Sequence, residues 1–215
     1  MNVSPSKENV LKKIRKALSQ STPIPFPQSE GNSSVYHPST QDLEVEFAEQ
    51  FSKLLGRFAY CVDVNDLNNQ LASLIVTQKW TKVFCNEPKL ASRLPAATIA
   101  APLYTDLPSC DVAITSCECL IARTGSMVLS AAQASGRTTS VYAPIHICIA
   151  TVDQLVYDLK DAFQLLKERY GNQLPSMISF ATGPSRTADI EKTLVVGVHG
   201  PKEVYVFLVE QLPSA

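Results

Sequence analysis

The sequence has little net charge, no long apolar run and no apolar N-terminal segment. Its 19 Lys and Arg residues nearly cancel its 20 Asp and Glu residues, leaving a net charge of −1. This balance argues against a nucleic-acid binder, whose affinity depends on many phosphate contacts. No run approaches the roughly 20 apolar residues of a membrane-spanning helix. The start, MNVSPSKENV, also lacks the apolar segment of a secretory signal, so we expect a cytoplasmic protein without a membrane span.

Several signatures of catalytic or cofactor chemistry are also missing. The chain contains no G-x-G-x-x-G motif, Walker phosphate loop, H-E-x-x-H zinc motif or G-x-S-x-G nucleophile elbow. Its six cysteines follow no usual zinc or iron–sulfur spacing, since the nearest pair, Cys117 and Cys119, is separated by a single residue. We therefore predict reduced, buried thiols, no metal site and no cofactor bound by this chain.

The first 41 residues differ in composition from the rest. Residues 6–19 have apolar side chains at helical spacing and predict an amphipathic helix with a basic opposite face. That face is either simply solvated or contacts an acidic partner or anionic surface. Residues 20–41 are rich in Pro, Ser and Thr and predict a linker. We therefore divide the chain into an N-terminal helix with a proline-rich arm, 1–41, and one domain, 42–215.

Helix-like and strand-like patterns alternate after residue 41. The predicted helices begin near Asp42, Asp66, Pro88 and Thr151, where Thr151 and Gln154 form a capping-box pattern. The strand-like runs are 58–64, 82–86, 98–101, 112–116, 126–130, 141–150, 177–181, 194–198 and 204–209. This alternation predicts an α/β domain with a largely parallel sheet.

Polar loops that follow strands are the first places to look for a site, because open α/β sheets bind ligands beyond the carboxyl ends of their strands. Thr124-Gly125-Ser126 places two hydroxyl groups around a glycine, which suits an oxyanion but is also common in plain turns.

A second loop begins at Gly183. Ser185 or Thr187 is placed to cap a short helix, and Arg186 carries a guanidinium for a carboxylate or phosphate. Alternatively, Arg186 pairs locally with Asp189.

A third loop contains His199, between two glycines at the end of an apolar run. This histidine is either an acid–base group, and so the candidate catalytic residue, or a structural residue bonded to the backbone. We expect the loops around Gly125 and Gly183 to meet, with His199 beside them, and to form a pocket for an anionic ligand.

Two of these segments resemble a known family. The segment TGPSRTADIE at 182–191, followed by GVHGP at 197–201, is similar to the signature of the lactate-utilisation protein C family. The turn at Thr124–Ser126 is similar to that family's central motif, and the N-terminal helix with its proline-rich stretch is similar too. Residues 60–110 match only in pattern. One departure is Arg123, which stands where family members often have an acidic residue; Glu118 would have to replace it if that carboxylate serves the chemistry.

The resemblance implies a fold and a function. The implied fold is a three-layer α/β/α sandwich, similar to coenzyme A transferases and ribose-phosphate isomerases. The implied role is that of a subunit in a bacterial system that oxidises L-lactate to pyruvate. Two cysteine-rich partner proteins of that system would carry the iron–sulfur clusters. This chain would supply a small-anion site or an assembly surface; alternatively, it is a free-standing enzyme or a sensor for a small carboxylate, phosphate or coenzyme A-like ligand.

Overall fold

The computed structural model describes residues 5–19, 38–39, 41–94, 105–188 and 194–210. Internal contacts divide the chain into a first unit, Met1–Pro38, and a second unit, Ser39–Ala215. In the first unit, α1 (Pro5–Ser19) covers the amphipathic segment. Among the described helices, none combines the length and the apolar character that a membrane crossing requires.

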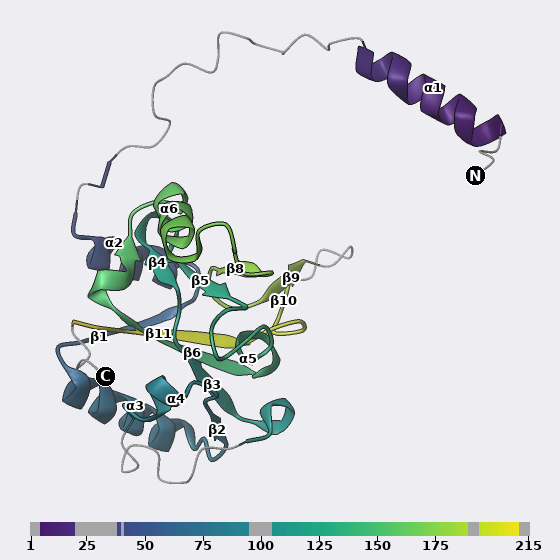
Figure 1. Cartoon of the computed structure of the whole chain (residues 1–215). Coiled ribbons are helices and arrows are strands. Elements are labelled where there is room, and N and C mark those ends of the chain that lie inside the picture. The colour runs from purple at the N-terminus through teal and green to yellow at the C-terminus, as the bar shows by residue number, and fades with distance from the viewer. Residues whose placement is uncertain (1–4, 20–37, 40, 95–104, 189–193, 211–215) are drawn as a thin grey trace. The chain divides into compact units, whose positions relative to one another are not determined.

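A five-stranded parallel sheet lies at the centre of the second unit (Figure 1). In spatial order its strands are β1 (Arg57–Cys61), β11 (Glu203–Val209), β6 (Ile145–Thr151), β3 (Val112–Thr115) and β2 (Val83–Phe84). All four neighbouring pairs run parallel. Strands β3, β6 and β11 are nearly all buried and rich in Val and Ile, as expected of a parallel sheet covered on both faces. The predicted α/β class with a largely parallel sheet is therefore confirmed.

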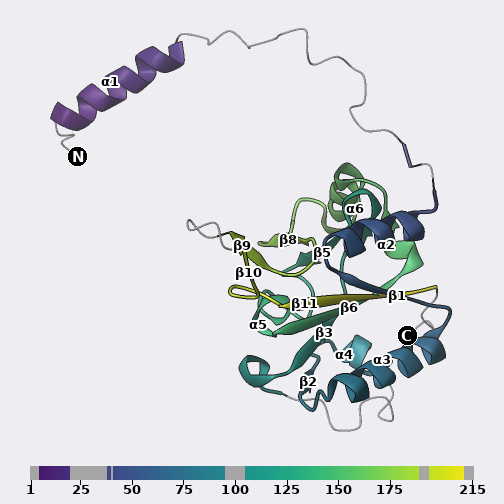
Figure 2. The ribbon, with the colours of Figure 1, turned by 180° about the vertical axis from the view of Figure 1, so that it is seen from behind.

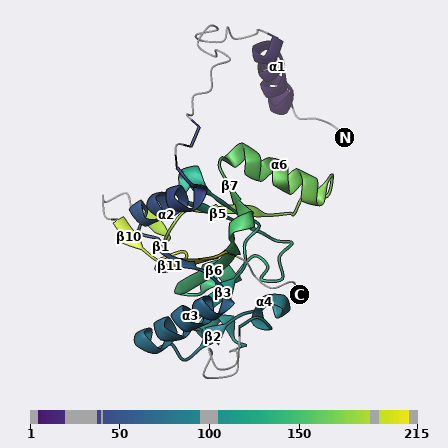
Figure 3. The same ribbon diagram turned by 90° about the vertical axis from the view of Figure 1, so that its left-hand side faces the viewer.

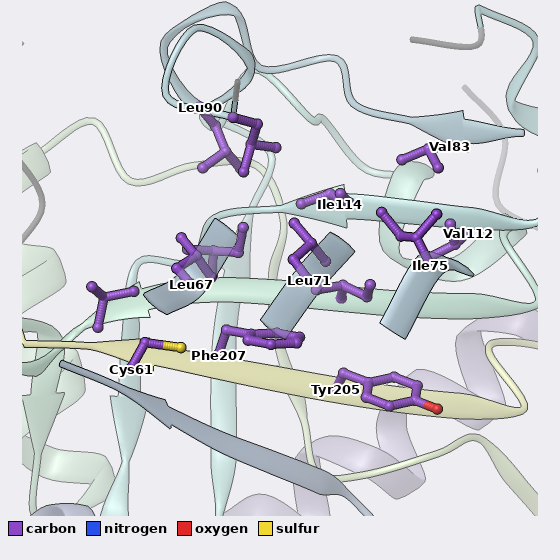
Figure 4. Close-up of a cluster of buried hydrophobic side chains, with 14 residues drawn as sticks. Cys61, Leu67, Leu71, Ile75, Val83, Leu90, Val112, Ile114, Tyr205 and Phe207 are labelled. Atoms are coloured by element: carbon purple, nitrogen blue, oxygen red, sulfur yellow. The ribbon is translucent and has the colours of Figure 1, made fainter. Parts of the chain in front are cut away.

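Helices α3 (Val64–Gln78) and α4 (Pro88–Ala91) cover one face of this sheet. Apolar residues recur along α3 every four positions, so they share one side of the helix and point at the strands (Figure 4). The cluster that they form with the sheet includes Leu67, Leu71, Ile75, Ile114 and Phe207.

A second sheet covers the other face. It contains, in spatial order, β7 (Leu155–Val156), β4 (Cys119–Ile121), β5 (Ser126–Ser130) and β8 (Ile178–Ala181). Helix α2 (Leu43–Lys53) lies on the same side of the central sheet (Figure 2). Phe47 and Phe51 of α2 join Met127 and Val206 in the core between the two sheets.

Helix α6 (Leu159–Tyr170) covers the outer face of the second sheet through Ala162 and Leu166. Viewed from the side, α3 and α4, the central sheet, the second sheet and α6 follow one another (Figure 3). The second sheet thus stands between the central parallel sheet and the outer helix. In this second sheet β5 pairs antiparallel with both β4 and β8, whereas β7 pairs parallel with β4.

The remaining elements are short. They are α5 (Thr139–Tyr142), the hairpin strands β9 (Arg186–Ala188) and β10 (Leu194–Val196), and the 3-10 helices η1 (Leu107–Ser109), η2 (Ala122–Thr124) and η3 (Val152–Gln154).

Two predicted elements differ in the structure, and a third lies outside the described residues. The predicted short helix after Gly183 is wrong, because Arg186 and Thr187 pair with β10 as a strand. The capping box at Thr151 opens only the 3-10 helix η3, and α6 starts later, behind a second capping box formed by Asp158 and Asp161. The predicted strand 98–101 lies outside the described residues.

Candidate functional site

The predicted loops around Gly125 and Gly183 do meet. Ser126 Oγ lies 2.8 Å from Thr124 Oγ1 and 2.8 Å from Thr182 Oγ1. Strands β5 and β8 pair beside this contact, with Met127 opposite Ala181. A chain of three hydroxyl groups therefore joins the start of β5 to the end of β8.

Helix α2 fills the space that these two loops were expected to leave open. Gly125 has φ +58°, and a Cβ there would lie 2.5 Å from the backbone nitrogen of Phe51. Gly183 has φ +81°, and a Cβ there would lie 2.6 Å from the carbonyl oxygen of Leu54. The Arg186 guanidinium donates a hydrogen bond to that same carbonyl. Because a helix C-terminus exposes unpaired carbonyls, this cluster fits the end of α2 better than it fits an anion.

Ser185 and Thr187 are engaged at the β9–β10 hairpin. The Ser185 N–H donates to the Pro201 carbonyl at 3.0 Å and the Gly197 N–H donates to the Ser185 carbonyl at 2.9 Å, which fixes the base of this hairpin. Thr187 pairs with Val195 in the hairpin. Asp189 lies outside the described residues.

His199 is exposed and lines a separate pocket of about 450 Å³ with Tyr142 and Lys202. The structure therefore does not bring it into the contact between Ser126 and Thr182.

A pocket of about 860 Å³ lies at the carboxyl edge of the central sheet; we call it the carboxyl-edge pocket. Residues that follow β2, β3, β6 and β11 line it: Glu87, Lys89, Leu90, Arg93, Ser116, Cys117, Ile149, Thr151, Val152, Asp153, Gln154 and Glu210. The chain leaves β2 towards α4 on one face and leaves β3 towards the second sheet on the other. Neighbouring strands whose connections part in this way open a crevice, which is where open α/β sheets bind ligands.

Glu87 fixes the wall of this crevice between β2 and β3. It is 8% exposed, and its carboxylate accepts hydrogen bonds from the Ser116 backbone N–H at 2.9 Å and the Ser116 hydroxyl at 2.5 Å. Ser116 Oγ in turn accepts a hydrogen bond from Gln133 Nε2 at 3.1 Å. A buried carboxylate with both oxygens bonded is well satisfied, so Glu87 holds the two strand exits together.

Gln154 holds the exit of β6 against the exit of β3. Its side-chain oxygen accepts a hydrogen bond from the Thr151 N–H at 2.9 Å, and its amide nitrogen donates to the Cys117 carbonyl at 2.7 Å. A hydrogen bond with Cys148 and burial raise the pKa of the Cys117 thiol well above its ordinary value. Cys117 is thus held as a neutral thiol rather than as a nucleophilic thiolate.

Charged side chains stand at the two ends of the pocket. Lys89 and Arg93 follow β2, whereas Asp153 follows β6 and Glu210 follows β11. None of the salt bridges formed by the described residues involves any of these four side chains. Two cations beside the Ser116 hydroxyl can bind a carboxylate or phosphate group.

Sequence reasoning missed these residues although part of the signal was present. Glu87 follows the predicted strand 82–86 and Ser116 ends the predicted strand 112–116, which are positions that the strand-end rule selects. The sequence instead predicted the site at the glycine-containing loops around Gly125 and Gly183. In the part of the chain that the structure describes, no group of three or more His, Cys, Asp or Glu side chains is placed to hold a metal ion.

Comparison with known proteins gives a consistent family assignment. The sequence profile of the LUD domain matches residues 77–209. Lactate utilization protein C of Bacillus licheniformis is 35% identical over 102 residues, covering 46% of this chain and 42% of that protein. The protein of the same name from Bacillus subtilis is 37% identical over 101 residues, again 46% and 42% of the two chains. This chain therefore matches less than half the length of these curated relatives.

A solved structure matches over more of the chain. The crystal structure of a DUF162 family protein from Deinococcus radiodurans superposes with a TM-score of 0.59 at 19% identity. The match covers 80% of this chain and 99% of that chain. At this identity the similarity shows a shared fold.

Proposed function

The chain belongs to the LUD domain family, and on that basis we propose that it acts in lactate utilisation by binding an anionic ligand in the carboxyl-edge pocket. Relatives named lactate utilization protein C support the general role. The observation that carries the ligand is the placement of Lys89 and Arg93 in a crevice at the switch point between β2 and β3. We therefore place the anion site in this pocket and not at Arg186, because the Arg186 guanidinium donates to the Leu54 carbonyl at the end of α2.

Two cations offer a geometry that matches an oxyanion. The planar guanidinium of Arg93 can bind two oxygens of one carboxylate or phosphate, and the Lys89 ammonium adds a second charge. The Ser116 hydroxyl donates to Glu87 and accepts from Gln133, so it belongs to the fixed wall of the pocket and leaves the anion to the two cations. The apolar side chains of Leu90, Ile149 and Val152 line the same pocket and lower the competition from water.

We further propose that this chain is one subunit of a bacterial L-lactate-oxidising system. In that system lactate loses two electrons and two protons to give pyruvate, and two cysteine-rich partner proteins receive the electrons on iron–sulfur clusters. The resemblance to the lactate-utilisation protein C family supports the assignment of these two partners. The six cysteines of this chain are free thiols, and all but Cys85 are buried. Free thiols fit a reducing cytoplasm.

Calorimetry on the full chain tests the anion site with lactate, pyruvate and inorganic phosphate as probes. We expect Arg93→Gln and Lys89→Gln each to weaken binding of the preferred anion about 10-fold, the loss of one charge-assisted contact. Lys167→Gln, on the exposed side of α6, is the matched charge control. Arg186→Ala should leave affinity unchanged. Loss of binding in Arg186→Ala with normal binding in both pocket variants would overturn this placement of the site.

A growth experiment tests the role in lactate utilisation. We expect deletion of this chain to abolish growth on lactate, and the Arg93→Gln variant to restore it poorly. Co-purification with two cysteine-rich proteins would support the subunit assignment. If deletion leaves lactate oxidation intact, or if the purified chain alone turns over a coenzyme A-like or phosphorylated substrate, the subunit proposal fails in favour of a free-standing enzyme.

A further inference from the structure

The carboxyl-edge pocket is longer than a lactate molecule. Its lining crosses four neighbouring strands, from β11 through β6 and β3 to β2. Neighbouring strands lie about 4.8 Å apart, so the exits of β11 and β2 are separated by roughly 14 Å. Glu210 follows the first of these strands, and Lys89 follows the last. A three-carbon acid that contacts Lys89 leaves the other end of the pocket without a ligand.

Charge differs between the two ends of the pocket. The end at β2 carries the cations Lys89 and Arg93 beside the Glu87 carboxylate, whose two oxygens are bonded to Ser116, and the end at β6 and β11 carries Asp153 and Glu210. The middle is lined by apolar Ile149 and Val152 together with the polar side chains of Thr151 and Gln154. A ligand that matches this order has an anion at one end and hydrogen-bond donors at the other.

Carboxylates at the end of a parallel strand bind hydroxyl groups of a sugar well, because an ionised carboxylate accepts two hydrogen bonds at once. Phosphate suits the opposite, cationic end. The apolar middle can contact a ring face while Thr151 and Gln154 meet polar edges.

We propose that the carboxyl-edge pocket binds a nucleoside 5′-monophosphate, with the phosphate at Lys89 and Arg93 and the ribose hydroxyls at Asp153 and Glu210. The inference rests on the anion site of the proposed function and adds the second, acidic end of the same pocket. The ligand class follows from the separation of the two charged ends and from the 860 Å³ that lie between them.

Calorimetry on the full chain tests this with three probes: adenosine 5′-monophosphate, adenosine and inorganic phosphate. We expect the monophosphate to bind at least about 10-fold more tightly than either of the others, because it alone contacts both ends. Asp153→Asn should weaken binding of the monophosphate about 5- to 10-fold and leave phosphate affinity unchanged. Arg93→Gln should weaken both. Glu168→Gln on α6 is the control for the loss of an exposed carboxylate, and circular dichroism checks that every variant is folded.

The outcomes separate this inference from the proposed function. If lactate or phosphate binds through Lys89 and Arg93 as tightly as the monophosphate, and Asp153→Asn changes nothing, the nucleotide proposal is overturned while the anion site stands. If none of the anions binds, both fail. Tighter binding of adenosine than of its monophosphate would also overturn the proposal, because the cationic end would then contribute nothing.

Discussion

Arg123 and Asp158 form a salt bridge, with 3.0 Å between Nη2 and Oδ1, that ties the turn before β5 to the N-terminus of α6. Both side chains are largely buried, and the Arg123 N–H also donates to the Tyr157 carbonyl at 3.1 Å. An acidic residue at position 123 would face Asp158, so here the position serves to hold α6.

The salt bridge between Arg123 and Asp158 should make the stability of the protein depend on pH. The hydrogen bond from Arg123 lowers the pKa of Asp158 below its unfolded value of 3.8. The stability that Asp158 contributes is therefore complete above pH 3.8 and is lost as the pH falls through the lower folded pKa. We expect Asp158→Asn to be less stable than the wild type near pH 7 by about 1–2 kcal/mol, and the difference to shrink as the pH falls from 3.8 towards 2. Urea unfolding at both pH values measures it, and a difference that persists in acid would contradict the charge-based explanation.

Glu118 provides a second test of how α6 is attached. Its carboxylate is 2% exposed and accepts hydrogen bonds from Ser130 Oγ at 2.5 Å, from the Tyr170 hydroxyl at 2.7 Å and from the Arg169 guanidinium. Glu118→Ala leaves the buried Ser130 hydroxyl without this acceptor and should cost about 3 kcal/mol.

Arg169→Met is the matched comparison for Glu118→Ala. Removal of the Arg169 guanidinium leaves the buried Glu118 carboxylate without a cation but with the Ser130 and Tyr170 donors, so we expect Arg169→Met to cost about 2 kcal/mol, less than Glu118→Ala. The double variant should be no less stable than Glu118→Ala alone, because the pair is already broken. Chemical unfolding of the three variants decides the point: equal losses in the two single variants would show that the charge pair, rather than the buried hydroxyl contacts, dominates.

Much of the central sheet could be predicted from the sequence, because buried parallel strands are nearly continuous apolar runs. The predicted strands 112–116 and 204–209 correspond closely to β3 (Val112–Thr115) and β11 (Glu203–Val209). The sequence predicts a helix after Gly183 because Ser185 and Thr187 are good helix caps, whereas in the structure this segment pairs as β9 with β10 (Leu194–Val196). Local propensity predicts poorly where strand pairing decides the structure.

The candidate site was harder to predict for a related reason. Glu87, Ser116, Gln154 and Glu210 are far apart in the sequence, and only the strand order brings them to one edge. No short motif marks them. The loops at Gly125 and Gly183 do have recognisable motifs, and the structure explains their glycines by close packing against α2.

Gly125→Ala tests that explanation. The residue has φ +58°, and its Cβ would lie 2.5 Å from backbone atoms of α2. A left-handed conformation costs roughly 1–2 kcal/mol for a residue with a Cβ, and displacing the helix adds about 1–3 kcal/mol. We therefore expect Gly125→Ala to lose about 2–5 kcal/mol of stability in urea unfolding.

Gly136→Ala is the control, because Gly136 has a similar φ of +68° but nothing within 4 Å of the added Cβ. Gly136→Ala should lose only the free energy that the left-handed conformation costs a residue with a Cβ, about 1 kcal/mol. Should the two variants be equally stable, close packing of the turn against α2 would not be the reason for glycine at position 125.

His146 makes stability depend on pH in a different range. It is 1% exposed within β6, its Nε2 lies 2.8 Å from Thr115 Oγ1, and burial lowers its pKa to about 4. In the unfolded chain this histidine has a pKa of about 6.5. Between about pH 6.5 and pH 4 the histidine is therefore protonated in the unfolded chain but neutral in the folded protein. Stability should thus decrease as the pH falls from about 6.5 to about 4, by about 3 kcal/mol in total.

His146→Gln isolates this effect. The variant loses stability near pH 7 because the packing around position 146 changes, but it should show no titration of this residue, and its stability should stay nearly level between about pH 6.5 and pH 4.5. His199→Gln, at an exposed position, should keep the slope of the wild type. Unfolding free energies at four or so pH values across this range give the slopes. A His146→Gln slope as steep as that of the wild type would mean that another group titrates there and that the buried histidine is not the cause.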